Sequence, residues 1–282
     1  MRIGVGLPAA IPGVCPGLLA AWARRAEAAG FDSLAVVDRV VFGSLDPMLA
    51  LAAAAAVTER PLLATTVLVA PLRRTALLAR QVVSLQRLSG GRLVLGVGAG
   101  ARAEDYRAAG WTTAARGRRM DRQLEALPDL VELGRTGAAA AMPATLVGGQ
   151  SAAAMARMAR YADGYVHGGG PPRAFARMTA MARAAWAESC RPGRPMLWGQ
   201  AHFAFGAADE RPARRYLRDY YAFTGPFADR VADCLITSRQ QLLELIAGYR
   251  EAGCDHLCLL PAVASLAQLD RLSEARAEAA VA

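Results

Sequence analysis

The stretch from Ala144 to Gly170 reads ATLVGGQSAAAMARMARYADGYVHGGG and contains a strand, a turn, a helix and a second strand. The apolar run from Ala144 to Val147 is typical of a buried parallel strand, and Ser151 is placed to cap the following helix. Gly148 and Gly149 between them let the backbone approach a ligand closely. Because the free N–H groups at a helix start attract anions, the sequence predicts a phosphate site at this turn.

Small residues also follow two other expected strands. They stand at the C-terminal ends of the strands, where barrel enzymes have their active site. A single glycine pair often does no more than end a strand. Three such strand ends are expected, however, where a flat ligand lies across the mouth of a barrel. The candidate cofactor-binding residues at these ends are Gly98, Ala99, Gly100, Gly148, Gly149, Gln150, Ser151, His167, Gly168 and Gly169.

The length of 282 residues fits one α/β barrel, and no Pro-, Gly- or Ser-rich linker divides the chain. We therefore expect a single domain over residues 1–282. Hydrophobic residues make up 54% of the chain, yet no run approaches the ~20 apolar residues of a membrane span. The opening MRIGVGLP lacks the features of a secretory signal, so we expect a cytoplasmic protein without a membrane partner.

Composition excludes several classes of chemistry. All 33 basic residues are arginine, so the chain has no lysine for a Schiff base, for pyridoxal phosphate or for a P-loop. The net charge of +9 is spread over helices, which favours a solvated surface and small anions over nucleic acid. Five scattered cysteines and three histidines show no metal-ligand spacing, so we expect reduced thiols and no metal.

Apolar strands alternate with amphipathic helices along the whole chain. The expected strands are Arg2–Leu7, Ser33–Val37, Leu62–Val69, Arg92–Val97, Ala144–Val147, Gly164–His167, Met196–Phe205 and Asp255–Leu260. The expected helices are Gly17–Ala29, Asp46–Thr58, Thr75–Leu88, Arg116–Leu133, Ala152–Tyr161, Phe175–Glu188, Arg239–Ala252 and Ser265–Ala279. Eight such pairs with right-handed crossovers predict a (β/α)8 TIM barrel. A doubly wound open sheet is the competing fold, and the lack of an early G-x-G-x-x-G disfavours it.

An ordered series of segments resembles a known family. It comprises the opening MRIGVGLP, the segment WARRAEAAGFDSLAVVDR, the run LATTVLVAPLRRTALLARQVVSLQRLSGGRLVLGVGAG, and the blocks LVGGQ and ARYADGY. In this order they are similar to the bacterial luciferase-like oxidoreductases, which use reduced FMN or its 5-deaza analogue, coenzyme F420. The resemblance covers nearly the whole chain and implies a barrel with the flavin at its C-terminal mouth.

The resemblance also implies roles for particular residues. It places the cofactor phosphate at the ends of the fifth and sixth strands, and a bulge with a non-prolyl cis peptide at Thr66 and Val67, against the flavin ring. The luciferases have a phosphate-binding arginine where Ala99 stands in this chain, and Arg102 is a candidate replacement.

Asp38 and Arg39 occupy the position where many relatives have an acidic residue followed by histidine, so they are the candidate catalytic residues. Arginine stays protonated, which puts in doubt the acid–base chemistry that a histidine would serve. The alternative role for Asp38 is a carboxylate that caps a helix or pairs with an arginine.

The aromatic segment after the seventh strand is the longest insertion available to cover the mouth. Gly225-Pro226 breaks its helix and could place Phe227 over the pocket. His202, within the seventh strand, is either a pocket residue or a core histidine. Phe227 and His202 are therefore the candidate substrate-pocket residues.

The leading hypothesis is a monooxygenase that uses reduced FMN and O2 on a small organic substrate. The alternatives are hydride transfer with coenzyme F420, and a barrel that has lost its cofactor and serves as a binding or scaffold protein. The resemblance further implies a homodimer, and the leading hypothesis a separate flavin reductase as partner.

Overall fold

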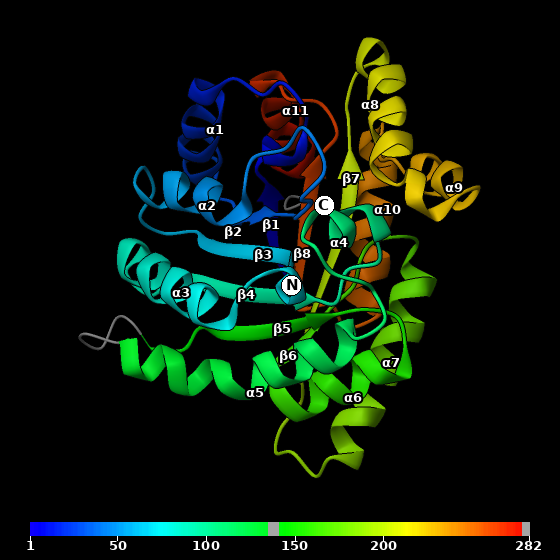
Figure 1. Ribbon diagram of the computed structural model, residues 1–282. Helices are drawn as coiled ribbons and strands as arrows, with labels where there is room; N and C mark the ends of the chain where they lie inside the picture. The colour runs from blue at the N-terminus through cyan, green and yellow to red at the C-terminus, as the bar shows by residue number, and fades with distance from the viewer. Residues whose placement is uncertain (135–140, 278–282) are drawn as a thin grey trace.

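The computed structural model describes residues 1–134 and 141–277, and Figure 1 shows their arrangement. Eight parallel strands close into a barrel in chain order, so the predicted (β/α)8 fold is confirmed. The strands are β1 (Arg2–Gly6), β2 (Ser33–Val36), β3 (Leu62–Val69), β4 (Leu93–Gly98), β5 (Ala144–Gly148), β6 (Gly164–Val166), β7 (Met196–Phe203) and β8 (His256–Pro261).

Helices surround the barrel, and additional helices lie in the segments that follow β4 and β7 (Figure 1). They are α1 (Pro16–Ala28), α2 (Pro47–Ala55), α3 (Thr75–Ser89), α4 (Ala103–Ala108), α5 (Arg116–Gly134), α6 (Ala152–Tyr161), α7 (Pro172–Glu188), α8 (Ala207–Tyr220), α9 (Phe227–Asp233), α10 (Arg239–Glu251) and α11 (Leu266–Ala277). The predicted last helix runs to Ala279, and its final two residues lie outside the described part of the chain.

Side chains alternate between the inside of the barrel and the helix layer. On β6, Val166 packs in the inner cluster, whereas Tyr165 packs in the large outer core under the helices. The inner cluster is small and comprises Ala35, Ala64, Val94, Leu146, Val166, Trp198, Cys258 and Leu260. Burial on both faces explains why the strands read as continuous apolar runs.

Polar side chains cap several helices where the sequence predicts it. Asp46 accepts hydrogen bonds from the backbone N–H groups of Met48 and Leu49 at the start of α2. Ser151 accepts one from the N–H of Ala154 at the start of α6. These caps fix the directions in which the two helices leave the barrel mouth.

The strand β7 is shorter than predicted. It ends at Phe203, because the next residue, Ala204, donates its N–H to the carbonyl of Ile236 instead of continuing the ladder with β8. Phe203 and Ile236 form an isolated parallel bridge, which closes the long insertion between β7 and β8. That insertion contains α8 and α9.

Strand β3 is irregular near the mouth. Its pairing with β4 shifts register between Thr65 and Leu68, and the Thr66–Val67 peptide is cis, as the family resemblance implies. Glycines on the neighbouring strands make room for this bulge. A Cβ on Gly96 would lie 2.0 Å from the Thr65 carbonyl oxygen, and one on Gly98 would lie 2.6 Å from a Val67 methyl group.

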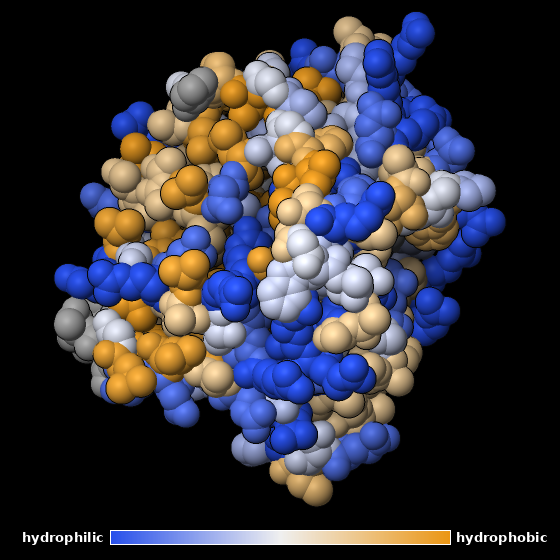
Figure 2. Space-filling view, viewed as in Figure 1, coloured by the Kyte–Doolittle hydropathy of each residue, from blue (hydrophilic) through white to orange (hydrophobic). Residues whose placement is uncertain are grey.

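No described helix is long and apolar enough to cross a membrane. Several leucines on α2 and α3 are nevertheless exposed to solvent, among them Leu49, Leu77 and Leu88. Figure 2 shows that apolar side chains gather over the side of the molecule that these helices cover.

We predict that Gly96→Ala destabilises the protein by about 1–3 kcal/mol, because the new methyl group forces the Thr65 carbonyl to move in a packed wall. The free energy of unfolding in urea measures the effect. The matched control is Gly17→Ala in α1, where no atom lies within 4 Å and φ is not positive. It should be neutral or stabilising, since alanine favours a helix. Equal effects at the two glycines would contradict this account of β3.

Candidate functional site

A cavity of about 770 Å³ lies at the C-terminal ends of the strands, within the range of ~300–1,000 Å³ that holds small molecules. Its walls come from strand ends, the start of α6 and the segment after α8. The predicted cofactor residues that line it are Thr66, Val67, Gly98, Ala99, Gly100, Gly148, Gly149, Gln150, Ser151 and Gly168. These ten residues therefore lie together in the cavity lining, and their cofactor-binding role stays a prediction.

A slightly larger cavity, of about 880 Å³, opens at the opposite end of the barrel beside Trp198 and His256. Three polar side chains of its lining, Arg194, Asp255 and Gln86, already have partners in the protein. Arg194 and Asp255 form a two-point ion pair at 2.7 and 2.9 Å. Gln86 bonds the N–H of Leu93 and the carbonyl of Ala141. Because barrel enzymes use the C-terminal end, we assign the site to the mouth cavity.

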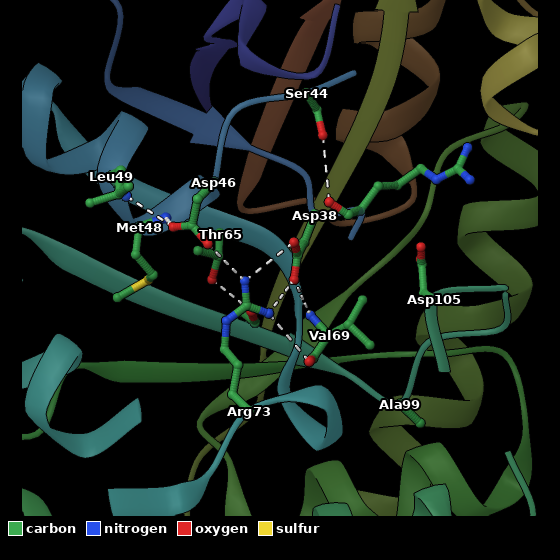
Figure 3. Close-up of polar contacts among 12 residues, drawn as sticks. Asp38, Ser44, Asp46, Met48, Leu49, Thr65, Val69, Arg73, Ala99 and Asp105 are labelled. Carbon is green, nitrogen blue, oxygen red and sulfur yellow. Dashed lines mark hydrogen bonds and ion pairs between the residues drawn. The ribbon is translucent and has the colours of Figure 1, made fainter. Parts of the chain in front are cut away.

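Asp38 lines the mouth cavity, but its carboxylate already forms hydrogen bonds with neighbouring residues (Figure 3). Its carboxylate accepts hydrogen bonds from the backbone N–H of Val69 at 2.9 Å and from Arg73 Nη1 at 2.6 Å. The Asp38 side chain is 1% exposed. The arginine-pairing alternative thus describes its contacts, and it ties the end of β2 to the end of β3.

The bulge of β3 forms part of the cavity wall, through Thr66 and Val67. Val67 packs where side chains would otherwise stand on Gly98 and Gly148, since a Cβ at those positions would come within 2.6 and 2.9 Å of its methyl groups. The strand-end glycines therefore serve two purposes. They accept the bulge, and they keep the wall free of projecting side chains.

The far end of the cavity suits an anion. Gly149 has φ +143°, and a Cβ there would lie 2.7 Å from that of Ala154, so the turn before α6 is a cradle that only glycine leaves open. Two arginines, Arg116 of α5 and Arg157 of α6, line the same cavity. Arg157 is held by Asp121 at 2.5 Å. Together they supply positive charge beside the N-terminus of α6.

Gln200, on the inner face of β7, is the polar group that most needs a ligand. It is 6% exposed and lines the cavity, and its Oε1 has no hydrogen-bond partner among the described residues. A buried carbonyl oxygen without a partner is costly. An N–H donor on a bound molecule would satisfy it, so the Gly149 cradle and Gln200 both fit a ring-bearing phosphate.

Arg39 is adjacent to the cavity but does not line it. It donates to Glu104 Oε1 at 2.7 Å and to the carbonyls of Val41 and Tyr220, and it packs over the ring of Phe42 at 4.4 Å. Burial lowers the pKa of Arg39, and the neighbouring charge of Arg102 lowers it further. Its contacts make it a clamp between the β2 loop, α4 and the end of α8.

The segment after α8 covers the mouth with Tyr220, Tyr221 and Phe223, which we call the lid rings. Phe227, expected over the pocket, does not line the cavity, because Gly225 and Pro226 start a new helix, α9, on which Phe227 is 53% exposed. The helix break was predicted from the sequence, but the chain after it runs away from the cavity. Phe223, before the break, takes the expected place.

His202 does not line the cavity either, but it supports a residue that does. Its Nε2 bonds the hydroxyl of Tyr221 at 3.1 Å. Burial lowers the pKa of His202 to about 4 and raises that of the Tyr221 hydroxyl to about 12, so both are neutral at pH 7. His202 therefore orients a lid ring.

His167 and Gly169 lie next to the site but outside the cavity lining. Because Val166 faces inward, His167 faces the helix layer, where its Nδ1 bonds the hydroxyl of Tyr165 at 3.2 Å and its ring packs on Phe175. The sequence predicts the turn at these residues, but it does not indicate which of their side chains face the cavity and which face the helix layer.

Sequence reasoning did not name Arg116, Arg157 and Gln200 for the cavity, and it chose Phe227 from the covering aromatic segment where the structure has Tyr220, Tyr221 and Phe223. Arg157 lies on α6, six residues after the N-cap Ser151, a spacing that does not place the two side chains on one face of a helix. The others reach the cavity from distant segments, and their residue types carry no local motif.

A family model described as luciferase-like monooxygenase matches residues 2–252. An uncharacterized protein of Mycobacterium tuberculosis strain H37Rv is 33% identical over 195 residues, which covers 56% of this chain and 67% of that protein.

Solved structures share the fold. The monooxygenase RslO1 from Streptomyces bottropensis matches with a TM-score of 0.78 and 20% identity, over 99% of this chain and 98% of that chain. An F420-dependent secondary alcohol dehydrogenase with an F420–acetone adduct has a TM-score of 0.78 and 18% identity, over 97% of both chains. The oxygenating constituent of 3,6-diketocamphane monooxygenase from Pseudomonas putida, with FMN, has a TM-score of 0.70 and 18% identity, over 92% and 91%.

We predict that Asp38→Asn lowers the free energy of unfolding by about 3 kcal/mol, because it breaks a buried ion pair and leaves Arg73 without its main partner. Urea denaturation measures this loss. Asp270→Asn is the control, since its pair with Arg25 has nearly the same length, 2.7 Å against 2.6 Å, but is exposed. It should cost no more than about 1 kcal/mol. If the two substitutions cost the same, Asp38 does not anchor β3.

Stability should also fall in acid, because burial lowers the pKa values of His167, His202 and His256 to about 4. Below pH 6.5 these histidines bind protons in the unfolded chain, whereas in the folded protein they stay neutral until the pH approaches 4. The unfolding free energy should therefore drop from pH 6.5 toward 4, by at most about 1.4 kcal/mol per pH unit for each histidine. Urea midpoints measured across this range test it, and His256→Gln should give a shallower slope. A flat profile would contradict the buried neutral histidines.

Proposed function

The chain belongs to the luciferase-like monooxygenase family, and we propose that this protein is a flavin-dependent monooxygenase that uses reduced FMN and O2 on a small organic substrate. The observation that carries the proposal is the mouth cavity itself. It has a wall at Thr66 and Val67 and an anion cradle at Gly149, with unpartnered Gln200 also in its lining. A planar ring system with a phosphate arm matches these features.

The residues present fit the flavin by its chemistry. The turn at Gly149, the start of α6 and the guanidinium groups of Arg116 and Arg157 would hold the phosphate. Gln200 Oε1 would accept a hydrogen bond from a ring N–H. Thr66 and Val67 would support the ring face.

When bound, a reduced flavin supplies the electrons and the reactivity toward O2. The protein's task is to position substrate and to exclude water, and the lid rings Tyr220, Tyr221 and Phe223 are placed for both. The tyrosine hydroxyls keep their protons near neutral pH, since burial raises the pKa of both. They can therefore donate hydrogen bonds in the closed site.

Hydride transfer with coenzyme F420 is the second candidate, and the shared fold of the F420-dependent alcohol dehydrogenase supports it. One observation favours the monooxygenase. Alcohol oxidation needs a base, and the one carboxylate in the described cavity lining is Asp38, already engaged by Arg73 and Val69. No histidine appears in that lining.

We also propose a cytoplasmic homodimer that receives reduced flavin from a separate reductase. The exposed leucines on α2 and α3 support an association surface, because exposed apolar patches commonly mark interfaces. Light scattering at several protein concentrations tests the oligomeric state.

The test of function is titration of the purified protein with FMN and with coenzyme F420, each oxidised and anaerobically reduced. We expect reduced FMN to bind, and its reoxidation by O2 to be slower than in free solution. Gly149→Val should weaken binding about tenfold or more, because its side chain fills the phosphate cradle and disfavours the positive φ.

Gly193→Val is the matched control. Gly193 also has a positive φ, of 69°, but it precedes β7 at the other end of the barrel and has no atom within 4 Å of an added Cβ. It should lose stability without losing FMN affinity. Binding of coenzyme F420 alone would favour hydride transfer. Failure of both cofactors to bind would favour the scaffold hypothesis.

A further inference from the structure

Arg102 is a buried cation at the mouth cavity that lacks a counter-ion. It is 9% exposed and lines the cavity. Its one hydrogen-bond partner in the described chain is the carbonyl of Tyr220, 3.3 Å from Nη2. No carboxylate of residues 1–134 or 141–277 forms an ion pair with it, and its buried Nε has no partner there.

Arg39 provides an internal comparison. It donates to the same Tyr220 carbonyl, at 3.3 Å, but its charge is met by Glu104 at 2.7 Å and it stands outside the cavity lining. The buried Nε of Arg39 also lacks a partner among the described residues, so the two arginines differ in the carboxylate and in the cavity lining. The Tyr220 carbonyl accounts for only one donor of Arg102.

Two aromatic rings lie against Arg102, and neither supplies a lone pair for its N–H groups. The rings of Tyr220 and Phe223 lie 4.7 and 4.3 Å from its guanidinium carbon, and such contacts stabilise a cation. The N–H groups lie in the guanidinium plane. An in-plane pair of N–H donors matches the two oxygens of a carboxylate.

The phosphate of a cofactor is the competing anion. The cradle at Gly149, with Arg116 and Arg157, already provides for it from α5 and α6. The ring and hydrogen-bond contacts of Arg102 are instead with the lid, through Tyr220 and Phe223. Arg102 is thus placed to meet the molecule that enters under the lid.

We infer that the substrate is a small organic carboxylate, whose acid group binds Arg102 and whose apolar part packs against the lid rings. This inference rests on the proposed function, since it assigns the rest of the cavity to the flavin. It makes Arg102 a specificity-determining residue and excludes neutral hydrocarbons as preferred substrates.

The experiment uses benzoate and its neutral isostere benzamide as probes, titrated calorimetrically into the protein with and without FMN. Benzoate should bind about 10- to 100-fold more tightly than benzamide, the usual strength of a charged hydrogen-bonded pair. Arg102→Met should remove this preference, and Arg102→Lys should retain part of it. Melting temperatures establish that each variant is folded, and Arg102→Lys preserves the test if Arg102→Met is not.

Arg39→Met is the matched control, because it removes the other clamp on Tyr220 without touching the cavity. It should keep the benzoate preference, and an equal loss in both variants would overturn the inference by making Arg102 a clamp only. Equal affinity of the wild type for both probes, or no binding of benzoate, would also overturn it.

Riboflavin, which lacks the phosphate, tests the remaining alternative, namely that Arg102 binds the phosphate of the cofactor. If Arg102→Met weakens FMN binding but not riboflavin binding, Arg102 is a phosphate ligand and the inference is overturned. If neither FMN nor coenzyme F420 binds the wild type, the proposed function fails. A benzoate preference that persists then supports the carboxylate site independently of it.

Discussion

The carboxylate of Asp38 joins the ends of β2 and β3, and the mouth of the barrel is organised around that link. It holds the N–H of Val69 beyond the bulge and pairs with Arg73, whose own carbonyl accepts a hydrogen bond from Gln123 of α5 at 2.9 Å. The same helix begins at Arg116, in the anion end of the cavity. One buried charge therefore connects the β3 wall of the cavity with the end that Arg116 lines.

The parts of this site that are local in sequence could be predicted from it. Gly149 and Ser151 sit in one turn whose geometry follows from their residue types, and the structure places them as expected. The cis peptide at Thr66 and Val67 came from family resemblance, since no rule of propensity points to it. The barrel followed from the count and order of alternating strands and helices.

The parts that depend on long-range packing could not be predicted. Arg39 looked catalytic by position, yet Glu104, sixty-five residues away, draws its side chain out of the cavity lining. Gln200 and Arg116 belong to no motif, and only folding brings both of them into the lining of the same cavity. The prediction that Phe227 lies over the pocket was wrong for a geometric reason. A break in a helix does not reveal the direction in which the next helix runs.

The lid has its own small core, which includes Ala213 and Leu217 of α8 together with Ala232 and Leu235. A parallel bridge between Phe203 and Ile236 joins it to the barrel, and bonds from Arg39, Arg102 and His202 hold its Tyr220 and Tyr221 at the mouth. Substitutions within the lid can thus alter what enters the cavity while the strand ends that would carry the flavin stay unchanged. Such a division separates the evolution of substrate choice from that of redox chemistry, and it makes the β7–β8 insertion the natural segment to exchange between homologous enzymes.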